Sequence, residues 1–410
     1  MTIPTGIFTV LGEPAVDRAS KVEILKEMGF TWADLESETY WIDQVVGMDR
    51  GIYEELEQAS RELWLILDKT ARYIHGKHDL YQLIGIPTIL WDLIDLLPIP
   101  ELGVMSRYAR FDYAISPDGS IKMLELNADT PTGYVEASIA TPWLCEQAGI
   151  RSVNGKMKPL VASAWAIEKP DTVACVAYGS HLEDSGTIEA LAKHSGLNVQ
   201  LEDCLNLWVD DGILKNGQGK PIHRMFALYP KEWMAHDDGG EALAYAIEKG
   251  YLHLFNSVHS ILLQSKGLQA AAWGLYELDV LFDRQEREII ERYMLPTYNK
   301  PVFDGDFVSK SMFGREGGSV KMFDQTGHLE MEDQEAFDTS KLFPVVYQKR
   351  TQLSRIRTAA GELHLLVGMF MINGETAGLL GRAGGPITGN SSHFIPIGVL
   401  ESDEEINDYR

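Results

Sequence analysis

The sequence predicts an α+β protein, because helical and strand patterns occupy separate stretches of the chain. A helical pattern fills much of the first 75 residues, and alternating strand patterns follow on both sides of a turn. Further along, one segment reads as strand, loop, helix and strand, which is typical of a small open sheet. With 410 residues, of which 45% are apolar, the chain is long enough for two or three packed domains.

Residues 21–75 are predicted to be helical. Apolar side chains recur at helical spacing with charged side chains between them, as on a helix with one buried face. Gly76 is the expected end of the helical stretch. The apolar stripe consists of Ile52, Leu56, Ala59, Leu63, Leu67 and Ile74.

A β-hairpin is predicted next. Tyr108–Ser116 and Ile121–Asn127 have strand patterns, and Pro117-Asp118-Gly119 between them has the composition of a turn. A two-residue turn would pair Asp112 with Glu125, whereas a three-residue turn would shift the register by one and send Glu125 to the opposite face. The local sequence suits either turn.

The hairpin carries the side chains best suited to chemistry. Because side chains alternate along a strand, Arg110 shares a face with Asp112, and Glu125 shares a face with Asn127. If the two faces coincide, two carboxylates and an amide oxygen converge, which suits Mg²⁺ held jointly with phosphates. Arg110 beside them could neutralise charge on a transferring phosphoryl group. A shared metal needs one face, so we expect the two-residue register or a bulge that restores it; a surface hairpin with cross-strand charge pairing is the alternative.

A strand–helix–strand unit is predicted in the middle of the chain. It consists of strand Thr172–Tyr178, loop Gly179–Ser185, helix Gly186–Ser195 and strand Leu197–Leu201. The loop carries two acids, Glu183 and Asp184, at the end of a strand where open α/β sheets usually bind ligands. A solvated loop with no binding role is the alternative.

The last third of the chain is predicted to change from helix to strands. The helix is expected over Ala270–Tyr293, and the strands over Phe307–Met312, Val345–Lys349, Leu363–Ile372 and Glu375–Leu380. The resulting domain prediction is 1–150 for a helical segment with the hairpin, 151–255 for a small α/β domain, and 256–410 for a closing α+β lobe. The acidic end from Glu401 to Asp408 is expected to be a solvated tail.

Two further segments suit phosphate chemistry. Lys310 lies on a predicted strand and is followed by a glycine-rich turn over residues 314–318, where backbone N–H groups can approach a nucleotide. The order of residues is not that of a Walker loop, and a simple hairpin turn is the alternative. Arg382 lies among glycines after another strand, where a surface arginine is the alternative.

Composition argues against several classes of protein. A formal charge of −24 disfavours nucleic acid and anionic membranes as partners and favours cationic ligands such as polyamines. No run of about 18 apolar residues could span a bilayer, and no secretory signal is expected at the N-terminus. Three cysteines without a CxxC pair fit a reducing cytoplasm. The histidines show no zinc motif, and no serine lies in a GxSxG elbow.

Taken together, these segments resemble the synthetase domain of bacterial glutathionylspermidine synthetase/amidase and its stand-alone acid–amine ligase paralogues, over essentially the whole chain. Residues 125–132, Glu-Leu-Asn-Ala-Asp-Thr-Pro-Thr, are similar to the family's E-x-N-A-D-T-P-T signature. Arg110-x-Asp112 lies at the family's spacing upstream. Other segments that resemble family motifs are Phe226–Met234, Ser265-Lys266 with Trp273, Lys310 with Gly314-Arg315-x-Gly317, Tyr347-Gln348 and Arg382.

The resemblance implies an ATP-grasp fold that has an N-terminal helical and β lobe and a small preATP-grasp-like α/β domain. It implies that Mg²⁺ is held by Asp112, Glu125 and Asn127. It also implies catalytic roles for Arg110 on the transferred phosphoryl group and for Arg382 on the acid or acyl phosphate. The implied ATP-binding residues are Lys266, Lys310, Gly314, Gly317, Tyr347 and Gln348, and the implied substrate-binding residues are Thr130, Thr132, Glu183 and Asp184.

We therefore expect an ATP- and Mg²⁺-dependent carbon–nitrogen ligase that joins a small-molecule carboxylate to an amine through an acyl phosphate. A glutathione-like peptide and a polyamine are the candidate substrates. A degenerate ATP-binding protein with a regulatory or assembly role is the alternative, and a phosphotransferase ending at a phosphate ester is a third reading. Ser311 and Ala227 depart from the family's proline and lysine, so the sequence leaves the acid and the amine open. Without an N-terminal cysteine amidase domain, the chain is not expected to hydrolyse its own product.

Overall fold

The computed structural model describes residues 6–12, 17–35, 38–168, 172–315, 317–333 and 338–401. Helices and sheets occur together throughout these ranges, which confirms the α+β class. The predicted acidic tail lies outside the described residues except for Glu401. No helix in the described ranges has the length and apolar character needed to cross a membrane.

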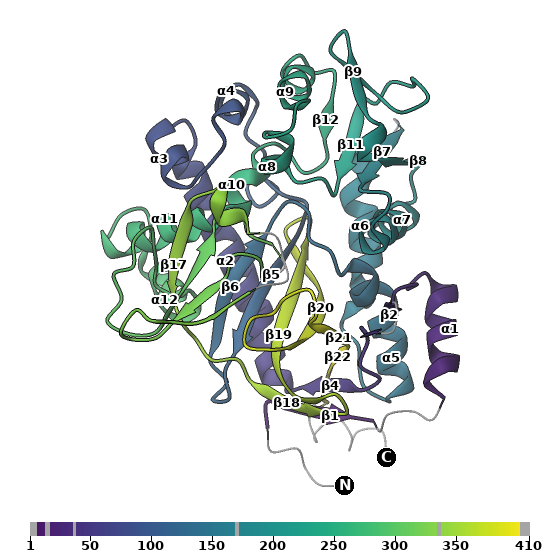
Figure 1. Ribbon diagram of the computed structural model, residues 1–410, viewed down its shortest axis with the longest axis vertical. Coiled ribbons are helices and arrows are strands. Elements are labelled where there is room, and N and C mark those ends of the chain that lie inside the picture. Colours follow the sequence, from purple (N-terminus) through teal and green to yellow (C-terminus); the bar gives the residue numbers. More distant parts are fainter. Residues whose placement is uncertain are drawn as a thin grey trace.

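The largest sheet lies in the middle of the molecule (Figure 1). Its strands follow the order β21-β20-β19-β5-β6, and β18 also pairs with β19. The sheet therefore joins the predicted hairpin to C-terminal strands, while the predicted domain boundaries stay a prediction. The strand bounds are β5 Tyr108–Ile115, β6 Ile121–Asn127, β18 Arg355–Thr358, β19 Gly361–Ile372, β20 Glu375–Gly384 and β21 His393–Ile395.

The hairpin of β5 and β6 contains a bulge that sets which side chains face the cavity. Near the turn the three-residue loop is formed, because the Ser116 N–H donates to the Ser120 carbonyl at 2.9 Å. The register then shifts past Leu124, so that Asp112 pairs with Glu125. Ile121 and Met123 face the core, and without the extra residue Glu125 would share their face. The expectation of a bulge that restores the register is confirmed.

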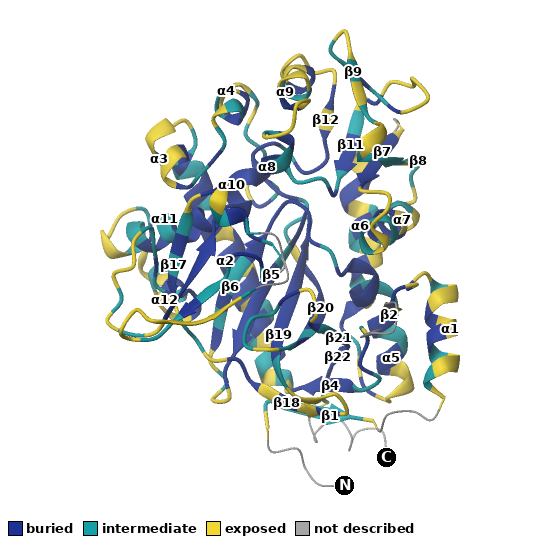
Figure 2. Ribbon diagram, in the orientation of Figure 1, coloured by how far each residue is buried: buried dark blue, intermediate teal, exposed yellow. Residues whose placement is uncertain are grey.

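Helix α2 (Arg50–Ile74) packs against the core face of this sheet. Asp49 caps it by accepting the Ile52 N–H at 3.1 Å. The predicted apolar stripe is buried apart from the partly exposed Ile52. Figure 2 shows the central strands largely in the colour of buried residues and the outer sides of α1, α3 and α9 exposed.

The prediction of one helical stretch over residues 21–75 is wrong in its middle. Helix α1 (Arg18–Met28) ends at Gly29, whose φ of 109° lies in the left-handed region. Strand β4 (Val45–Met48) then pairs with β1 (Phe8–Leu11) and β22 (Ile397–Val399). Pairing with strands from both ends of the chain decides this segment, and helical periodicity could not reveal it.

A four-stranded parallel sheet has the order β12-β11-β7-β8 and carries α7 (upper right in Figure 1). Both strands predicted in the middle of the chain are present. Helix α7 begins at Leu182, four residues before the predicted start, so Glu183 and Asp184 lie in its first turn and not in a loop. The bounds are β7 Val173–Ala177, α7 Leu182–Ser195, β8 Val199–Asp203, β11 Arg224–Ala227 and β12 His253–Leu254.

A five-stranded antiparallel sheet has the order β13-β17-β14-β15-β16. The predicted strands that carry Lys310 and Gln348 are β14 and β17, and they are neighbours. The single helix predicted over Ala270–Tyr293 is wrong, because two helices are separated by a turn in which Asp279 and Leu281 have positive φ. The bounds are α11 Lys266–Glu277, α12 Arg284–Tyr293, β13 Thr297–Tyr298, β14 Phe307–Ser311, β15 Lys321–Phe323, β16 Leu329–Glu332 and β17 Val345–Lys349.

The remaining elements are short and connect these sheets. A π-helical turn, Glu136–Ala140, follows the hairpin and leads into α5. The helices are α3 His78–Leu83, α4 Trp91–Leu96, α5 Thr141–Gln147, α6 Met157–Trp165, α8 Lys231–Met234, α9 Gly240–Glu248 and α10 Ser260–Gln264. The strands are β2 Asp34–Leu35, β3 Glu38–Thr39, β9 Trp208–Asp210 and β10 Ile213–Lys215.

Candidate active site

Four side chains of the hairpin lie on the same face of the central sheet, and we call Arg110, Asp112, Glu125 and Asn127 the hairpin cluster. Arg110 donates to both carboxylate oxygens of Asp112, from Nε at 2.6 Å and from Nη2 at 2.9 Å. Its Nη1 donates to the Thr132 carbonyl at 2.6 Å. These bonds fix the guanidinium beside the carboxylate, and the predicted common face is confirmed.

The two carboxylates of the hairpin cluster converge on one point. Nδ2 of Asn127 donates to Oδ2 of Asp112 at 3.0 Å and to Oε1 of Glu125 at 3.2 Å. Hard carboxylate oxygens placed this close suit Mg²⁺, with Asn127 presenting its amide oxygen in place of its nitrogen. Within the described ranges no group of three or more His, Cys, Asp or Glu could hold a metal ion, so water or nucleotide oxygens would complete the coordination.

Two buried lysines lie beside Glu125 on the other side of the cluster. Nζ of Lys266, at the start of α11, lies 3.2 Å from Oε2 of Glu125 and donates to the Gly314 carbonyl at 2.7 Å. Nζ of Lys310, on β14, donates to Oε1 of Gln348 at 2.9 Å and to the Leu124 carbonyl at 3.2 Å. The structure thus brings both predicted phosphate-binding lysines close to Glu125, the carboxylate that is predicted to bind the metal.

The charges of this group shift each other's protonation. Burial alone would raise the pKa of Glu125, but Lys266 and Lys310 outweigh it and hold that pKa below its ordinary value. Burial lowers the pKa of Lys310 to about 8, although Glu125 opposes this shift. Glu125 is therefore ionised near neutral pH, and the charge of Lys310 can change at moderately alkaline pH.

A cavity extends from these lysines along the five-stranded sheet. It carries the polar groups of a phosphate site at one end and apolar side chains beyond it, which suits a nucleotide. Gly317 has a φ of 74°, and a Cβ there would lie 2.7 Å from the Thr388 carbonyl, so glycine is required. The lining includes Lys266, Lys310, Gly314, Gly317, Gly318, Gln348, Val308, Val320, Met322, Leu353 and Leu366.

Tyr347 differs from the other predicted nucleotide-binding residues. It precedes Gln348 on β17, and neighbouring strand residues point to opposite faces. The Tyr347 ring packs 6.1 Å from that of Phe307 and does not line the cavity. Its role in nucleotide binding therefore stays a prediction that this cavity does not support.

A second cavity meets the first at the hairpin cluster. Glu125, Gly317, Leu366 and Thr388 line both of them. The second cavity brings together most of the predicted catalytic, metal and substrate residues, namely Arg110, Asp112, Asn127, Thr130, Thr132, Asp184 and Arg382. Glu183 does not line it, and its charge instead acts on Glu136, whose pKa is raised to about 7 by burial and then by Glu183.

Arg382 is held in the second cavity by the main chain. Its Nη2 donates to the carbonyl of Gly389 at 2.9 Å and to that of Ser392 at 3.2 Å, and its Nε has no partner among the described residues. The guanidinium also lies 6.0 Å from the Tyr40 ring. Because carbonyls and not a carboxylate hold it, its positive charge can act on an anionic substrate.

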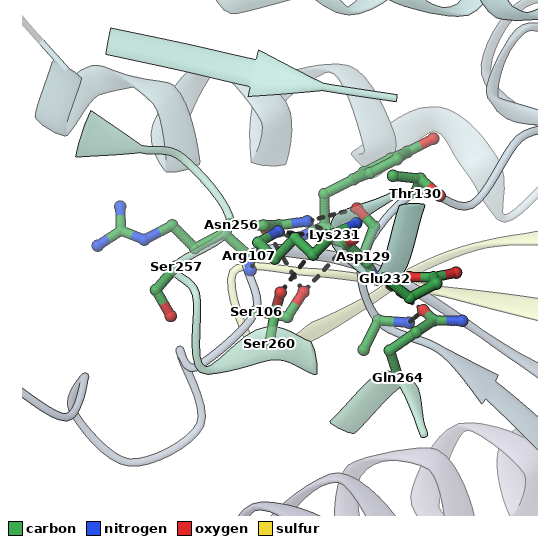
Figure 3. Close-up of polar contacts among 12 residues, drawn as sticks. Ser106, Arg107, Asp129, Thr130, Lys231, Glu232, Asn256, Ser257, Ser260 and Gln264 are labelled. Atoms are coloured by element: carbon green, nitrogen blue, oxygen red, sulfur yellow. Dashed lines mark hydrogen bonds and ion pairs between the residues drawn. The ribbon is translucent and has the colours of Figure 1, made fainter. Parts of the chain in front are cut away.

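Sequence reasoning missed the buried network, a name we give to Asp129, Thr130, Lys231, Glu232 and Arg315. Lys231 pairs with Asp129, and Glu232 accepts from Arg315 Nε at 3.0 Å and Nη2 at 2.7 Å. Figure 3 shows Lys231 directed towards Asp129, whereas Glu232 extends away from that pair. All five residues fall in motifs noted in the sequence, but consecutive charges at Lys231 and Glu232 inside an apolar segment were the only local signal.

Comparison with known families identifies the class of protein to which this fold and these two adjoining cavities belong. The family described as glutathionylspermidine synthase preATP-grasp matches residues 13–400, and the chain belongs to it. A Haemophilus influenzae protein named "Putative acid--amine ligase" is 26% identical over an alignment of 410 residues, which covers 92% of this chain and 96% of that protein.

Proposed function

We propose that the protein is an ATP- and Mg²⁺-dependent ligase that joins a carboxylic acid to an amine. The observation that carries this proposal is the position of Glu125, which lies where the lysine-lined cavity meets the cavity of Thr130, Asp184 and Arg382. A phosphoryl group held by the lysines would there be adjacent to an acid in the second cavity. The family and the name of the relative support the same class of reaction.

The proposed reaction has two steps. The acid's carboxylate oxygen attacks the γ-phosphorus of ATP, which gives an acyl phosphate and ADP. The amine nitrogen then attacks the acyl carbon, loses a proton and expels inorganic phosphate. Mg²⁺, when bound by the hairpin cluster, neutralises phosphate charge. Arg110, Lys266 and Lys310 position the phosphates and stabilise charge on the transferring group, so no protein nucleophile is needed.

The substrates that we propose are a glutathione-like peptide as the acid and a polyamine as the amine. Thr130 and Thr132 offer hydroxyl groups to the acid, and Arg382 offers an uncompensated positive charge. Asp184 lines the same cavity and Glu183 adds negative charge nearby, which favours a cationic amine. A variant with Glu183→Gln and Asp184→Asn should therefore raise the KM of the amine, and an unchanged KM would remove this assignment.

The experiment that tests the function is phosphate release from ATP across a panel of carboxylates and polyamines, with mass spectrometry of the products. We expect release that requires Mg²⁺ and rises with a matching acid–amine pair, together with an amide product. ATP hydrolysis that ignores every acid and amine would favour an ATP-binding regulator instead. A stable phosphate ester as the product would indicate a phosphotransferase.

A further inference from the structure

Glu232 is a fully buried carboxylate that contacts the glycine-rich loop through Arg315. It is 0% exposed, and Oε1 accepts both the Nε and the Nη2 hydrogens of Arg315. A buried carboxylate that receives two N–H groups of one guanidinium fixes the plane of that group as well as its position. Arg315 then uses Nη1 to donate to Oγ1 of Thr130 at 2.6 Å.

The helix that carries Glu232 is itself fixed from the other side. Lys231, its neighbour in α8, forms a buried ion pair with Asp129, and the Lys231 N–H donates to Oδ2 of Asp129 at 3.0 Å. Ser260 Oγ adds a donor to Asp129 at 3.3 Å (Figure 3). Glu232 therefore cannot follow Arg315 if the loop moves, because the preceding residue is tied to the segment that carries Thr130.

The glycine-rich loop is held at two consecutive residues. The Gly314 carbonyl accepts from Lys266 Nζ in the nucleotide cavity, and Arg315 contacts Glu232 and Thr130 in the second cavity. The loop closes on itself where the Gly318 N–H donates to the Arg315 carbonyl at 2.7 Å. One short segment thus touches both cavities, and Glu232 holds its second attachment.

We propose that Glu232 is a positioning residue, which acts through Arg315 to hold the glycine-rich loop in place and to align the Thr130 hydroxyl in the second cavity. The order of the nucleotide loop and the geometry of the acid site then depend on the same carboxylate. These contacts are present whether or not the protein has ligase activity. Only the identity of the ligands rests on the proposed function.

The first test measures loop order in the ligand-free protein by hydrogen–deuterium exchange. In Glu232→Gln, amides in residues 312–315 and 317–322 should exchange about tenfold faster or more, because the bonds from Arg315 lose their charge assistance. Arg315→Ala removes the same contact from its less buried partner and should give the same local increase in exchange. Asp68→Asn is the matched control, since Asp68 is a buried carboxylate paired with Arg72 on α2, and it should leave the loop unchanged. Unaltered exchange in both Glu232→Gln and Arg315→Ala would overturn the proposal.

The second test separates positioning from general destabilisation. Glu232→Gln should raise the KM of the acid about tenfold and leave the KM of ATP within about twofold, because Lys266 still holds the nucleotide end of the loop. Adding Glu232→Gln to Arg315→Ala should cost nothing further, since Glu232 acts through Arg315. Additive losses, or equal changes in both KM values, would contradict it. A protein that shows the loop effect but no ligase activity would refute only the proposed function.

Discussion

Two charged clusters lie next to each other at the second cavity and differ in how their charges are used. In the hairpin cluster, Glu125 interacts with Asn127 and also with the neighbouring Lys266 and Lys310. All four side chains line one or both of the cavities. In the buried network, Asp129 and Glu232 are 1% and 0% exposed, and their paired cations are directed at them. The charged groups of the first arrangement can change partners when a ligand binds, whereas the ion pairs of the second can only be broken. Substitutions in the first should change binding and turnover directly, whereas substitutions in the second should change stability and order and should affect acid binding only through that order.

The largest effect is expected when the buried network loses one charge. Lys231→Met leaves the Asp129 carboxylate buried without its cation and should reduce the free energy of unfolding by about 3–5 kcal/mol. Urea denaturation measures this loss. Combining Lys231→Met with Asp129→Asn is the control and should restore part of it, because the buried charge is then gone. A loss below about 1 kcal/mol for Lys231→Met would erase the contrast between the clusters.

Neutralising the hairpin cluster should have the opposite profile. Asp112→Asn keeps the shape of the side chain. It removes the negative charge that belongs to the proposed metal site and that pairs with Arg110. We expect turnover to fall about 10²–10³-fold, by analogy with removal of one electrostatic group from an active site. The thermal midpoint should fall by less than it does in Lys231→Met, because Glu125 still stabilises the charge of Arg110. Steady-state kinetics with a Mg²⁺ titration give the first quantity and calorimetry the second; normal turnover would show that the convergence of carboxylates has no catalytic role.

Within the hairpin cluster and its neighbours, the lysines and the arginine should be separable. Lys266→Ala and Lys310→Ala should chiefly weaken nucleotide binding, and Arg110→Ala should chiefly slow turnover, each by about 2–4 kcal/mol. The reason is that, in the proposed reaction, the lysines would contact ground-state phosphates, whereas Arg110 would act on charge that develops during transfer. ATP affinity and kcat for the three variants test this division. An Arg110→Ala variant with a raised ATP KM and unchanged kcat would reverse the roles.

The pKa of Lys310 predicts how nucleotide affinity depends on pH. With a pKa of about 8 in the free protein, Lys310 is charged below that pH and loses its proton above it. Affinity for a non-hydrolysable ATP analogue should therefore be level below about pH 7 and fall by up to about tenfold per pH unit above pH 8. Titration calorimetry across this range measures it. Lys310→Arg should remove the decline, since arginine stays charged, and a decline that persists in it would implicate another group.

The smallest effect concerns Glu136, at the start of the π-helical turn that follows the hairpin. Its oxygen Oε1 accepts from Trp32 Nε1 at 2.8 Å and from the Tyr40 hydroxyl at 3.0 Å, while burial and Glu183 raise its pKa to about 7. When the pKa of a carboxyl is higher in the folded protein than in the unfolded one, the free energy of unfolding falls as pH rises from the unfolded pKa to the folded pKa. Glu136→Gln should thus stabilise the protein by on the order of 1 kcal/mol at about pH 8 and by little near pH 5. Equal urea midpoints for both proteins at the higher pH would contradict this.

The sequence predicted what depends on neighbouring residues and missed what depends on distant ones. The strands of the hairpin follow from alternation and the composition of the turn, and both are present. The common face of Asp112 and Glu125 is expected because a shared metal needs one face, and it depends on a bulge that the local pattern does not reveal. The break between α11 and α12 depends on non-glycine residues in left-handed conformations, which composition does not reveal. The contact of Arg315 with Glu232 spans 83 positions, so its role could not be read from local pattern.

The bulge in the hairpin has a consequence for how this segment can vary in length. Leu124, the extra residue, turns its carbonyl to Lys310 Nζ at 3.2 Å and Gln348 Nε2 at 3.4 Å. Adding or removing one residue between Asp112 and Glu125 would exchange core and cavity faces on one arm, whereas a change of two would preserve them. Insertions or deletions in the hairpin should therefore be tolerated only when they change its length by an even number of residues.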